Sequence, residues 1–189
     1  MERLNKGQCL QNASQNALLS AAELHGAAHQ RPQLFQVMVK ANRRPVECGK
    51  VGVQFVACKD MEGTSTVARN TPRGLLRVAS PEATALELIG YADQSGGLDN
   101  VASVLSELVE AINPDHLIAE CGRSPVAWLQ RLGYLLDLTE HHDLADKLVP
   151  SVVARAKDVA PLVRARSRSG SPRNERWKLV INATMEPDP

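Results

Sequence analysis

Apolar residues in the second half of the chain recur every three or four positions, which is the spacing of one buried face of an α-helix. The segment from Leu98 to Ile112 shows this spacing, and so does the segment that follows Ser124. Their apolar positions are Leu98, Val101, Leu105, Leu108 and Ile112 in the first segment, and Trp128, Leu129, Leu132, Leu135 and Leu136 in the second. Both segments are therefore predicted to be helices that pack on a core.

Three dipeptides in this half carry the signature of a helix start. In Ser80-Pro81, Asn113-Pro114 and Ser124-Pro125, a polar side chain can accept a hydrogen bond from a free first-turn N–H. Proline at the first helical position costs little, because the N–H that it lacks would have no partner there. The pair Gly96-Gly97 is predicted to separate the first of these helices from the next.

The first half of the chain begins with a polar stretch and a short apolar one. Residues 1–16 are rich in Gln and Asn and have no clear period, so we expect a polar tail or a remnant linker. Small apolar residues between Ala17 and Ala28 then predict a helix that packs closely on another element. Arg31-Pro32 is expected to end this helix, because proline disfavours helical geometry in the residue before it.

Residues 34–78 have the character of strands. From Val51 to Val56, large apolar residues occupy every second position, which is the period of a sheet. The predicted strands are residues 34–39, 45–47, 51–56 and 75–78, with tight turns at residues 48–50 and 70–74.

The end of the chain combines a helical or mixed segment at residues 152–163, a basic loop at Arg164–Lys178 and a closing strand at residues 177–182. The predicted fold class is α/β in the broad sense, that is α+β. It has a mixed, mostly antiparallel sheet in the N-terminal half with packed helices, and a helical C-terminal half closed by a terminal strand. Residues 17–189 are expected to form one domain.

Composition narrows the classes of function. The 189 residues are 43% apolar, enough to bury one core, and the net charge of +1 means that any basic surface must be local. Aromatic residues make up 3%, which argues against a stacking platform for single-stranded nucleic acid. No apolar run approaches the roughly 18 residues of a membrane span, and the N-terminus lacks the apolar region of a secretory signal. We expect a cytoplasmic protein with reduced thiols.

The sequence lacks the common motifs of catalytic and cofactor-binding sites: it contains no GxSxG, no GxxxxGK[ST] and no GxGxxG. The cysteines are Cys9, Cys48, Cys58 and Cys121. None of them has the spacing of a zinc site or a local base partner. His25 and His29 lie four positions apart, a spacing that can bind a metal, but no third ligand is evident and packing is the alternative. We therefore expect no enzyme, no cofactor and no metal.

Basic residues are the most suggestive group in the sequence. They gather in the strands and turns of the first half and again near the C-terminus, where an arginine can reach phosphates or the carboxylates of a partner. An ordinary solvated surface is the alternative. The candidate contacts to nucleic acid or a partner are Arg43, Arg44, Arg69, Arg73, Arg77, Arg164, Arg166, Arg168, Arg173, Arg176 and Lys178. Among these, Arg69, Arg73 and Arg77 and the Arg164–Lys178 loop are the preferred functional surface.

Several segments resemble the second domain of AbiEi-type antitoxins, from type IV toxin–antitoxin systems. The most distinctive are Leu18–Gln30 and the stretch from Asn70-Thr71-Pro72-Arg73-Gly74 through Arg77 to Leu86. The likeness continues in Gly97–Val101, Gln130–Leu136 and Arg176–Asn182. It runs from about Ala17 to the end of the chain, and its motifs contain no recognisable catalytic residue.

This resemblance implies a non-enzymatic antitoxin of abortive infection, a form of phage defence, that counters a nucleotidyltransferase-like toxin and helps to repress its own operon. Type IV antitoxins counter the effect of the toxin without necessarily forming a stable complex with it. Family members normally carry an N-terminal winged-helix DNA-binding domain, and residues 1–16 are not similar to one. That domain is therefore expected to be absent, which favours neutralisation over repression. The alternative is an accessory nucleic-acid-binding module of a transcriptional regulator, with promoter DNA as its partner.

Overall fold

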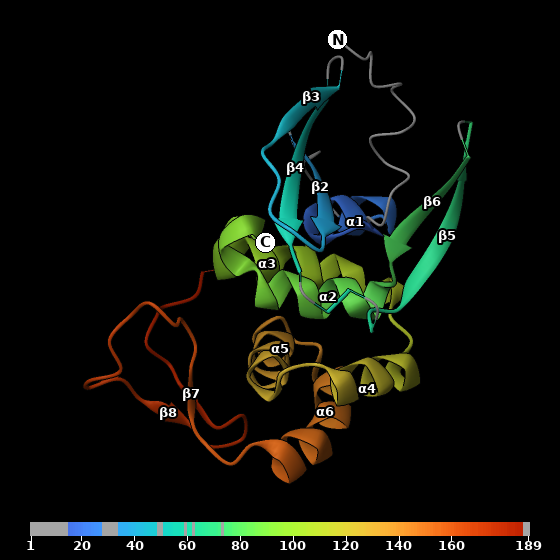
Figure 1. Cartoon of the computed structure of the whole chain (residues 1–189). Coiled ribbons are helices and arrows are strands. Elements are labelled where there is room, and N and C mark those ends of the chain that lie inside the picture. The colour runs from blue at the N-terminus through green and yellow to red at the C-terminus, as the bar shows by residue number, and fades with distance from the viewer. Residues whose placement is uncertain are drawn as a thin grey trace.

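The computed structural model describes residues 15–27, 34–48, 51–58, 60–61, 63–72 and 74–186. In these residues a six-stranded sheet lies above a stack of helices, and a small three-stranded sheet lies beside the last of them (Figure 1). None of the described helices is long and apolar enough to cross a bilayer.

The larger sheet has the strand order β3-β4-β2-β1-β6-β5. Its strands are β1 (Gln15–Asn16), β2 (Leu34–Val39), β3 (Val46–Cys48), β4 (Val51–Ala57), β5 (Thr66–Thr71) and β6 (Gly74–Ala79). The pairs β2–β4 and β1–β6 are parallel, whereas β1–β2, β3–β4 and β5–β6 are antiparallel. The structure thus confirms the predicted α+β class and its mixed, mostly antiparallel sheet.

The predicted polar tail of residues 1–16 ends too late, because Gln15 and Asn16 form the strand that joins the two halves of the sheet. Each of these side chains is 2% exposed. The strand has no apolar residues to mark it in the sequence, because its polar side chains are buried through hydrogen bonds. Gln15 Nε2, for example, donates to Glu87 Oε1 at 3.0 Å. Residues 1–14 lie outside the described residues.

Helix α1 (Leu18–Leu24) is shorter than the predicted helix of residues 17–28. It ends because Gly26 adopts a left-handed backbone with φ of 89°. The N–H groups of Gly26 and Ala27 then bond back to carbonyls of the last turn at 3.0 and 2.9 Å, which is a Schellman termination. Arg31-Pro32, expected to end the helix, lies outside the described residues.

The remaining α-helices are α2 (Pro81–Gly90), α3 (Gly97–Leu108), α4 (Pro114–Arg123), α5 (Val126–Leu138) and α6 (His142–Arg155), with short 3-10 helices η2 (Ala92–Ser95) and η3 (Val109–Ala111). The predicted break before α3 is confirmed at Gly96, which adopts a left-handed backbone with φ of 82°, although α2 already ends at Gly90 and Gly97 is the first residue of α3. The predicted helix over 98–112 is split, because α3 gives way to η3 and Ile112 is already extended.

Two of the three predicted helix caps are confirmed. Ser80 Oγ accepts a first-turn N–H at 3.2 Å, and Asn113 Oδ1 accepts two, at 3.0 and 3.2 Å. The cap at Ser124 is wrong: Ser124 ends α4, and its hydroxyl donates to the Glu120 carbonyl at 3.1 Å. Helix α5 therefore begins at Val126 without a side-chain cap, because the preceding helix already uses the serine.

Helix α2 is the centre of the core, since every residue from Glu82 to Ile89 is buried. It packs against α1, α3, α4 and α5 and against the end of β6. A helix that is buried all round lies between two layers. One layer is the sheet with α1, and the other is the group α4, α5 and α6 (Figure 1).

The small sheet consists of β7 (Ala160–Pro161), β8 (Arg173–Asn174) and β9 (Leu179–Val180), in the order β7-β9-β8. The predicted closing strand of residues 177–182 is therefore confirmed only at β9. Trp177 lies in the turn before it and is fully buried. The mixed segment 152–163 comprises the end of α6 and strand β7.

Candidate functional site

The β5–β6 hairpin holds two of the predicted arginines on opposite faces. Arg69 pairs with Leu76 across the hairpin, whereas Arg77 pairs with Ala68, so the two arginines differ in parity along the strands. Both side chains are exposed. Arg77 shares its face with Leu75, which is 70% exposed. The predicted group of Arg69, Arg73 and Arg77 is thus not one continuous face, and Arg73 itself lies outside the described residues.

Arg69 is directed at His25, the residue at the C-terminal cap of α1. His25 Nε2 lies 2.8 Å from the carbonyl oxygen of Ala79, and Arg69 Nη2 lies 3.5 Å from His25 Nδ1. These contacts suit a neutral imidazole in which Nε2–H donates and Nδ1 accepts. Burial lowers the pKa of His25 further, and the Arg69 charge acts in the same direction. His25 therefore orients this end of the sheet, and His29, four positions along the chain, lies outside the described residues.

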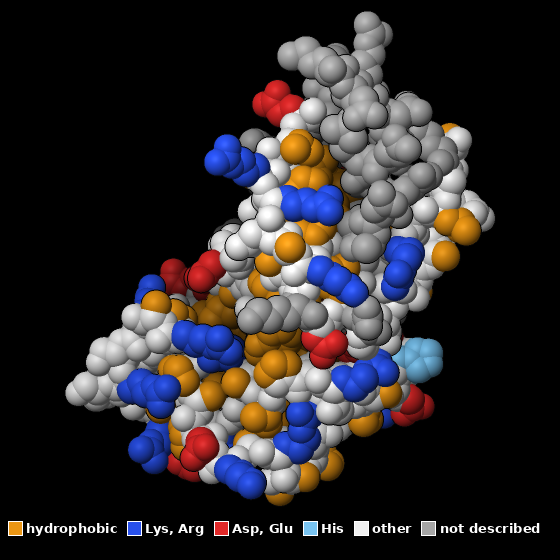
Figure 2. Space-filling view, viewed as in Figure 1, with side chains coloured by type: hydrophobic (Ala, Val, Ile, Leu, Met, Phe, Trp, Pro, Cys, Tyr) orange, Lys and Arg blue, Asp and Glu red, His pale blue; other side chains and the backbone are white. Residues whose placement is uncertain are grey.

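Arg43 and Arg44 lie between β2 and β3 and are exposed. The Arg43 guanidinium is centred 6.0 Å from the ring of Phe55 on β4, the outer limit of a cation–π contact. Figure 2 shows that the face in view carries Lys and Arg side chains from the strands down to the C-terminal segment, with fewer Asp and Glu side chains among them.

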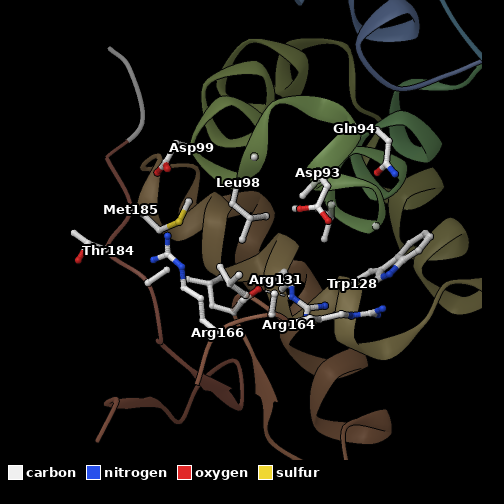
Figure 3. A pocket seen from close by; sticks show the side chains of 18 residues that line it. Asp93, Gln94, Leu98, Asp99, Trp128, Arg131, Arg164, Arg166, Thr184 and Met185 are labelled. Atoms are coloured by element: carbon white, nitrogen blue, oxygen red, sulfur yellow. Dashed lines mark hydrogen bonds between the residues drawn. The ribbon is translucent and has the colours of Figure 1, made fainter. Parts of the chain in front are cut away.

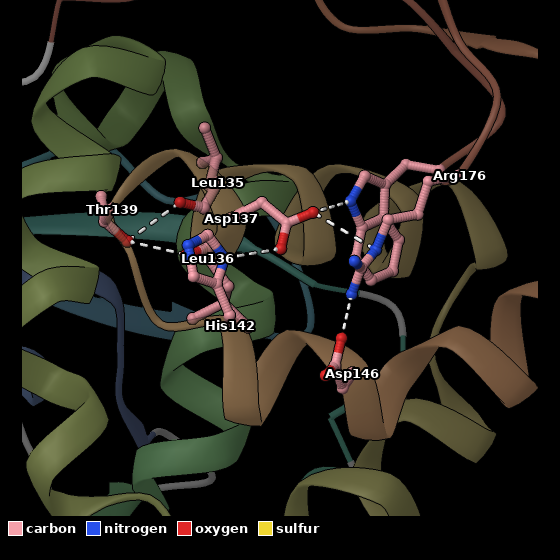
Figure 4. Close-up of polar contacts among 8 residues, drawn as sticks. Leu135, Leu136, Asp137, Thr139, His142, Asp146 and Arg176 are labelled. Atoms are coloured by element: carbon pink, nitrogen blue, oxygen red, sulfur yellow. Dashed lines mark hydrogen bonds and ion pairs between the residues drawn. The ribbon is translucent and has the colours of Figure 1, made fainter.

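The C-terminal candidates divide into an exposed group and a fixed group. Arg176 forms ion pairs with Asp137, at 3.3 Å, and with Asp146, and its guanidinium lies 5.0 Å from the ring centre of Trp177 (Figure 4). Lys178 Nζ donates to the Ala156 carbonyl at 2.7 Å. Arg176 and Lys178 therefore hold the fold together. The exposed group is Arg164, Arg166, Arg168 and Arg173.

Trp177 anchors this segment on α5. Its Nε1–H donates to Asp137 Oδ2 at 2.7 Å, while Asp137 Oδ1 lies 3.2 Å from His142 Nδ1 (Figure 4). The ring lies against Gly133, where an added Cβ would stand 2.1 Å from it. Glycine is required at this position because the indole occupies the space of a side chain.

Helix α5 carries a buried arginine, Arg131, that is not among the candidates predicted from the sequence. Arg131 is 4% exposed. It donates to the carbonyls of Leu162 at 2.8 Å, Pro161 at 2.7 Å and Ala127 at 3.0 Å. Burial lowers the pKa of Arg131 to about 10, and the nearby Arg164 charge adds to this. The sequence indicates this burial only through the position of Arg131 between Leu129 and Leu132, on the apolar side of a helix.

A pocket of about 300 Å³ lies beside Arg131. One wall comes from α2, η2, α3 and α5, and the other from the C-terminal segment that carries Arg164 and Arg166 (Figure 3). Trp128 and Asp93 belong to the first wall. The pocket therefore combines cationic, acidic and aromatic side chains.

Under the sheet lies a buried carboxyl group, Glu87 on α2. It is 5% exposed and receives hydrogen bonds from the Gln15 side chain and the Leu18 backbone. Burial is the main reason that the pKa of Glu87 is raised, to about 8. Its Oε2 and the Gln15 Oε1 are buried without a partner in the described part of the chain. A proton on Oε2 would supply a donor where both atoms are acceptors, so the neutral acid suits this site.

Comparison with known protein families places the sequence in one class, the antitoxins. The family model of the AbiEi antitoxin C-terminal domain matches residues 15–138. The chain therefore belongs to this family of antitoxin domains. This confirms the family expected from the sequence motifs.

The fold is shared with a solved structure, that of the RV2827C protein from Mycobacterium tuberculosis. The TM-score is 0.62 at 22% sequence identity, and the match covers 90% of this chain and 63% of that chain. The chain thus spans less than two thirds of the length of the protein that it resembles. No curated protein matches the chain in sequence.

Proposed function

We propose that this chain is an antitoxin of a type IV toxin–antitoxin system that counters a nucleotidyltransferase-like toxin without catalysis, and that it contributes to repression of its own operon. The observation that carries the proposal is the family match over residues 15–138. In this proposal, nucleotidyl transfer belongs to the toxin and the chain acts by contact alone, as part of abortive infection of phage-infected cells.

The contact surface we propose consists of exposed arginines that are not used to hold the fold. Within the described ranges, no carboxylate forms an ion pair with any of them. Their guanidinium groups can therefore pair with the carboxylates or phosphates of a partner. They are Arg43, Arg44, Arg77, Arg164, Arg166, Arg168 and Arg173.

Co-expression with the toxin encoded beside this chain tests the proposal. The full chain should restore growth, and a double variant Arg77→Glu/Arg168→Glu should restore less. The matched control is Lys147→Glu, which removes one exposed cation on α6 and should rescue fully. A folded, abundant wild-type chain that gives no rescue contradicts the antitoxin proposal. Full rescue by the double variant would instead contradict the proposed surface alone.

The same exposed arginines support a second candidate, an accessory module that contacts promoter DNA. Binding would then weaken with salt, and each lost phosphate contact would reduce the slope of log K against log salt by about 0.9. The measurement is a salt titration of operon promoter DNA with the wild type, Arg77→Ala and Arg168→Ala. Unchanged affinity and slope in both variants would exclude these residues as DNA contacts.

A further inference from the structure

The pocket beside Arg131 contains cationic groups that the fold does not neutralise. An arginine carries five N–H donors. Backbone carbonyls accept three from Arg131, and no described carboxylate forms an ion pair with it. Arg164 and Arg166 line the same cavity from the C-terminal segment. A buried charge without an opposite charge is costly, so this site gains from a bound anion.

The neighbouring cations reinforce one another. The charge of Arg164 is close enough to disfavour protonation of Arg131, and Figure 3 shows the two side chains next to each other at the edge of the pocket. Two guanidinium groups in this relation offer the forked donors that match the oxygens of a phosphate.

The wall formed by the helices, to which Arg131 itself belongs, also carries groups suited to a different part of a ligand. The indole of Trp128 and the side chain of Leu98 provide flat and apolar surface. Asp93, on η2, provides acceptors for N–H or hydroxyl groups. The cavity of about 300 Å³ lies at the lower end of the range of small-molecule sites, which suits one small ligand.

We propose that this pocket binds a mononucleotide, with its phosphate at Arg131 and Arg164 and its nucleoside against Trp128, Leu98 and Asp93. Nucleotide binding goes beyond the toxin contact proposed above, because the pocket is lined by the helices and the C-terminal segment and by no residue of the β5–β6 hairpin, although Arg164 and Arg166 belong to both sites.

Calorimetric titration of the full chain with AMP, GMP, CMP and UMP tests the proposal, with adenosine and inorganic phosphate as separate probes. At least one mononucleotide should bind with a Kd below about 1 mM. Adenosine and inorganic phosphate should each bind at least about tenfold more weakly, because each lacks one half of the contacts. Arg164→Gln should weaken nucleotide binding about tenfold.

Arg168→Gln is the matched control, because Arg168 is an exposed arginine on the same segment that does not line the pocket. It should leave the affinity within about twofold. Both arginines are exposed, so both variants should fold, which thermal melting verifies. The proposal is overturned by the absence of saturable nucleotide binding, by equal weakening in the two variants, or by inorganic phosphate binding as tightly as the nucleotide.

Discussion

The basic residues of the β5–β6 hairpin differ from those of the C-terminal segment in what surrounds them. Among the described contacts, Arg77 reaches one acceptor, Thr66 Oγ1, at 3.5 Å. Arg176 instead lies between two carboxylates and an indole ring, and Lys178 is bonded to a backbone carbonyl. A run of cations is therefore not a binding surface in itself, because its role depends on the acceptors that the fold brings to it.

The same difference extends to the way each region is anchored. The C-terminal segment is attached to α5 through the buried Trp177 and through Arg131. The sheet is attached to α2 through the buried pair of Gln15 and Glu87. The attachment at Trp177 is mainly apolar, whereas the attachment at Glu87 depends on the protonation of its carboxyl group. Mutations should distinguish the two.

The largest expected effect is at the apolar anchor. Trp177→Ala should lower the free energy of unfolding by about 3–5 kcal/mol, because it empties a fully buried aromatic site. Gly133→Ala should also destabilise strongly, since its Cβ would stand 2.1 Å from the Trp177 ring. Urea denaturation measures both.

Arg168→Ala is the control and should change stability by less than about 0.5 kcal/mol. A loss below about 1 kcal/mol in Trp177→Ala would show that this segment is not held as described.

The second effect is a pH dependence at the polar anchor. The pKa of Glu87 is raised, mainly by burial, to about 8 in the folded chain. The protonated Glu87 therefore stabilises the folded chain. This contribution to the free energy of unfolding is fully present below the unfolded pKa of about 4.5 and is lost as the pH rises through about 8. Between pH 5 and pH 7 the free energy of unfolding should fall by up to about 1.4 kcal/mol per pH unit. Urea denaturation at a series of pH values measures this slope.

Glu87→Gln should flatten that slope, because the amide is neutral at every pH and still fits beside Gln15. The variant should be more stable than the wild type at pH 8 and above. Titration of Tyr91, whose pKa is also raised by burial, falls above this window. A variant that keeps the wild-type slope would assign the pH dependence to another group.

The third effect concerns Arg176. Arg176→Gln should destabilise by about 1 kcal/mol, since exposed ion pairs contribute about 0–1 kcal/mol and a cation–π contact adds about 0.5–1 kcal/mol. Part of the loss should vanish in 1 M salt, which screens the pairs with Asp137 and Asp146. Chemical denaturation at two salt concentrations measures it. Equal stability of Arg176→Gln and the wild type would place Arg176 with the exposed cations.

The features predicted correctly from the sequence were those with local causes. The caps at Ser80 and Asn113, the apolar faces of α3 and α5 and the hairpin before β4 follow from hydrogen bonding and periodicity within a few residues. The parallel pairing of β2 with β4 and the insertion of β1 are set by contacts between distant segments. No local pattern encodes them.

The candidate site was less predictable for the same reason. The roles of Arg77 and Arg176 depend on tertiary neighbours, because Arg176 forms ion pairs with Asp137 and Asp146 on other segments of the chain. Arg131 is missing from the predicted candidates because these come from the basic clusters of the strands, turns and C-terminal segment, and Arg131 lies within helix α5. Its acceptors, Leu162 and Pro161, lie about 30 residues away in the chain.

The smallest expected change in stability, and the clearest separation of the two regions, is at Arg77. Arg77→Gln should alter the free energy of unfolding by less than about 0.5 kcal/mol, because the side chain is exposed and its one contact is long. If the hairpin meets a partner, the same variant should rescue growth from the toxin less well than Arg176→Gln does, once both are compared at equal amounts of folded protein. Stability would then be lost at Arg176 without loss of function, and function at Arg77 without loss of stability. A destabilised Arg77→Gln, or rescue that is equal in the two variants, would mean that the hairpin and the C-terminal segment do not divide these roles.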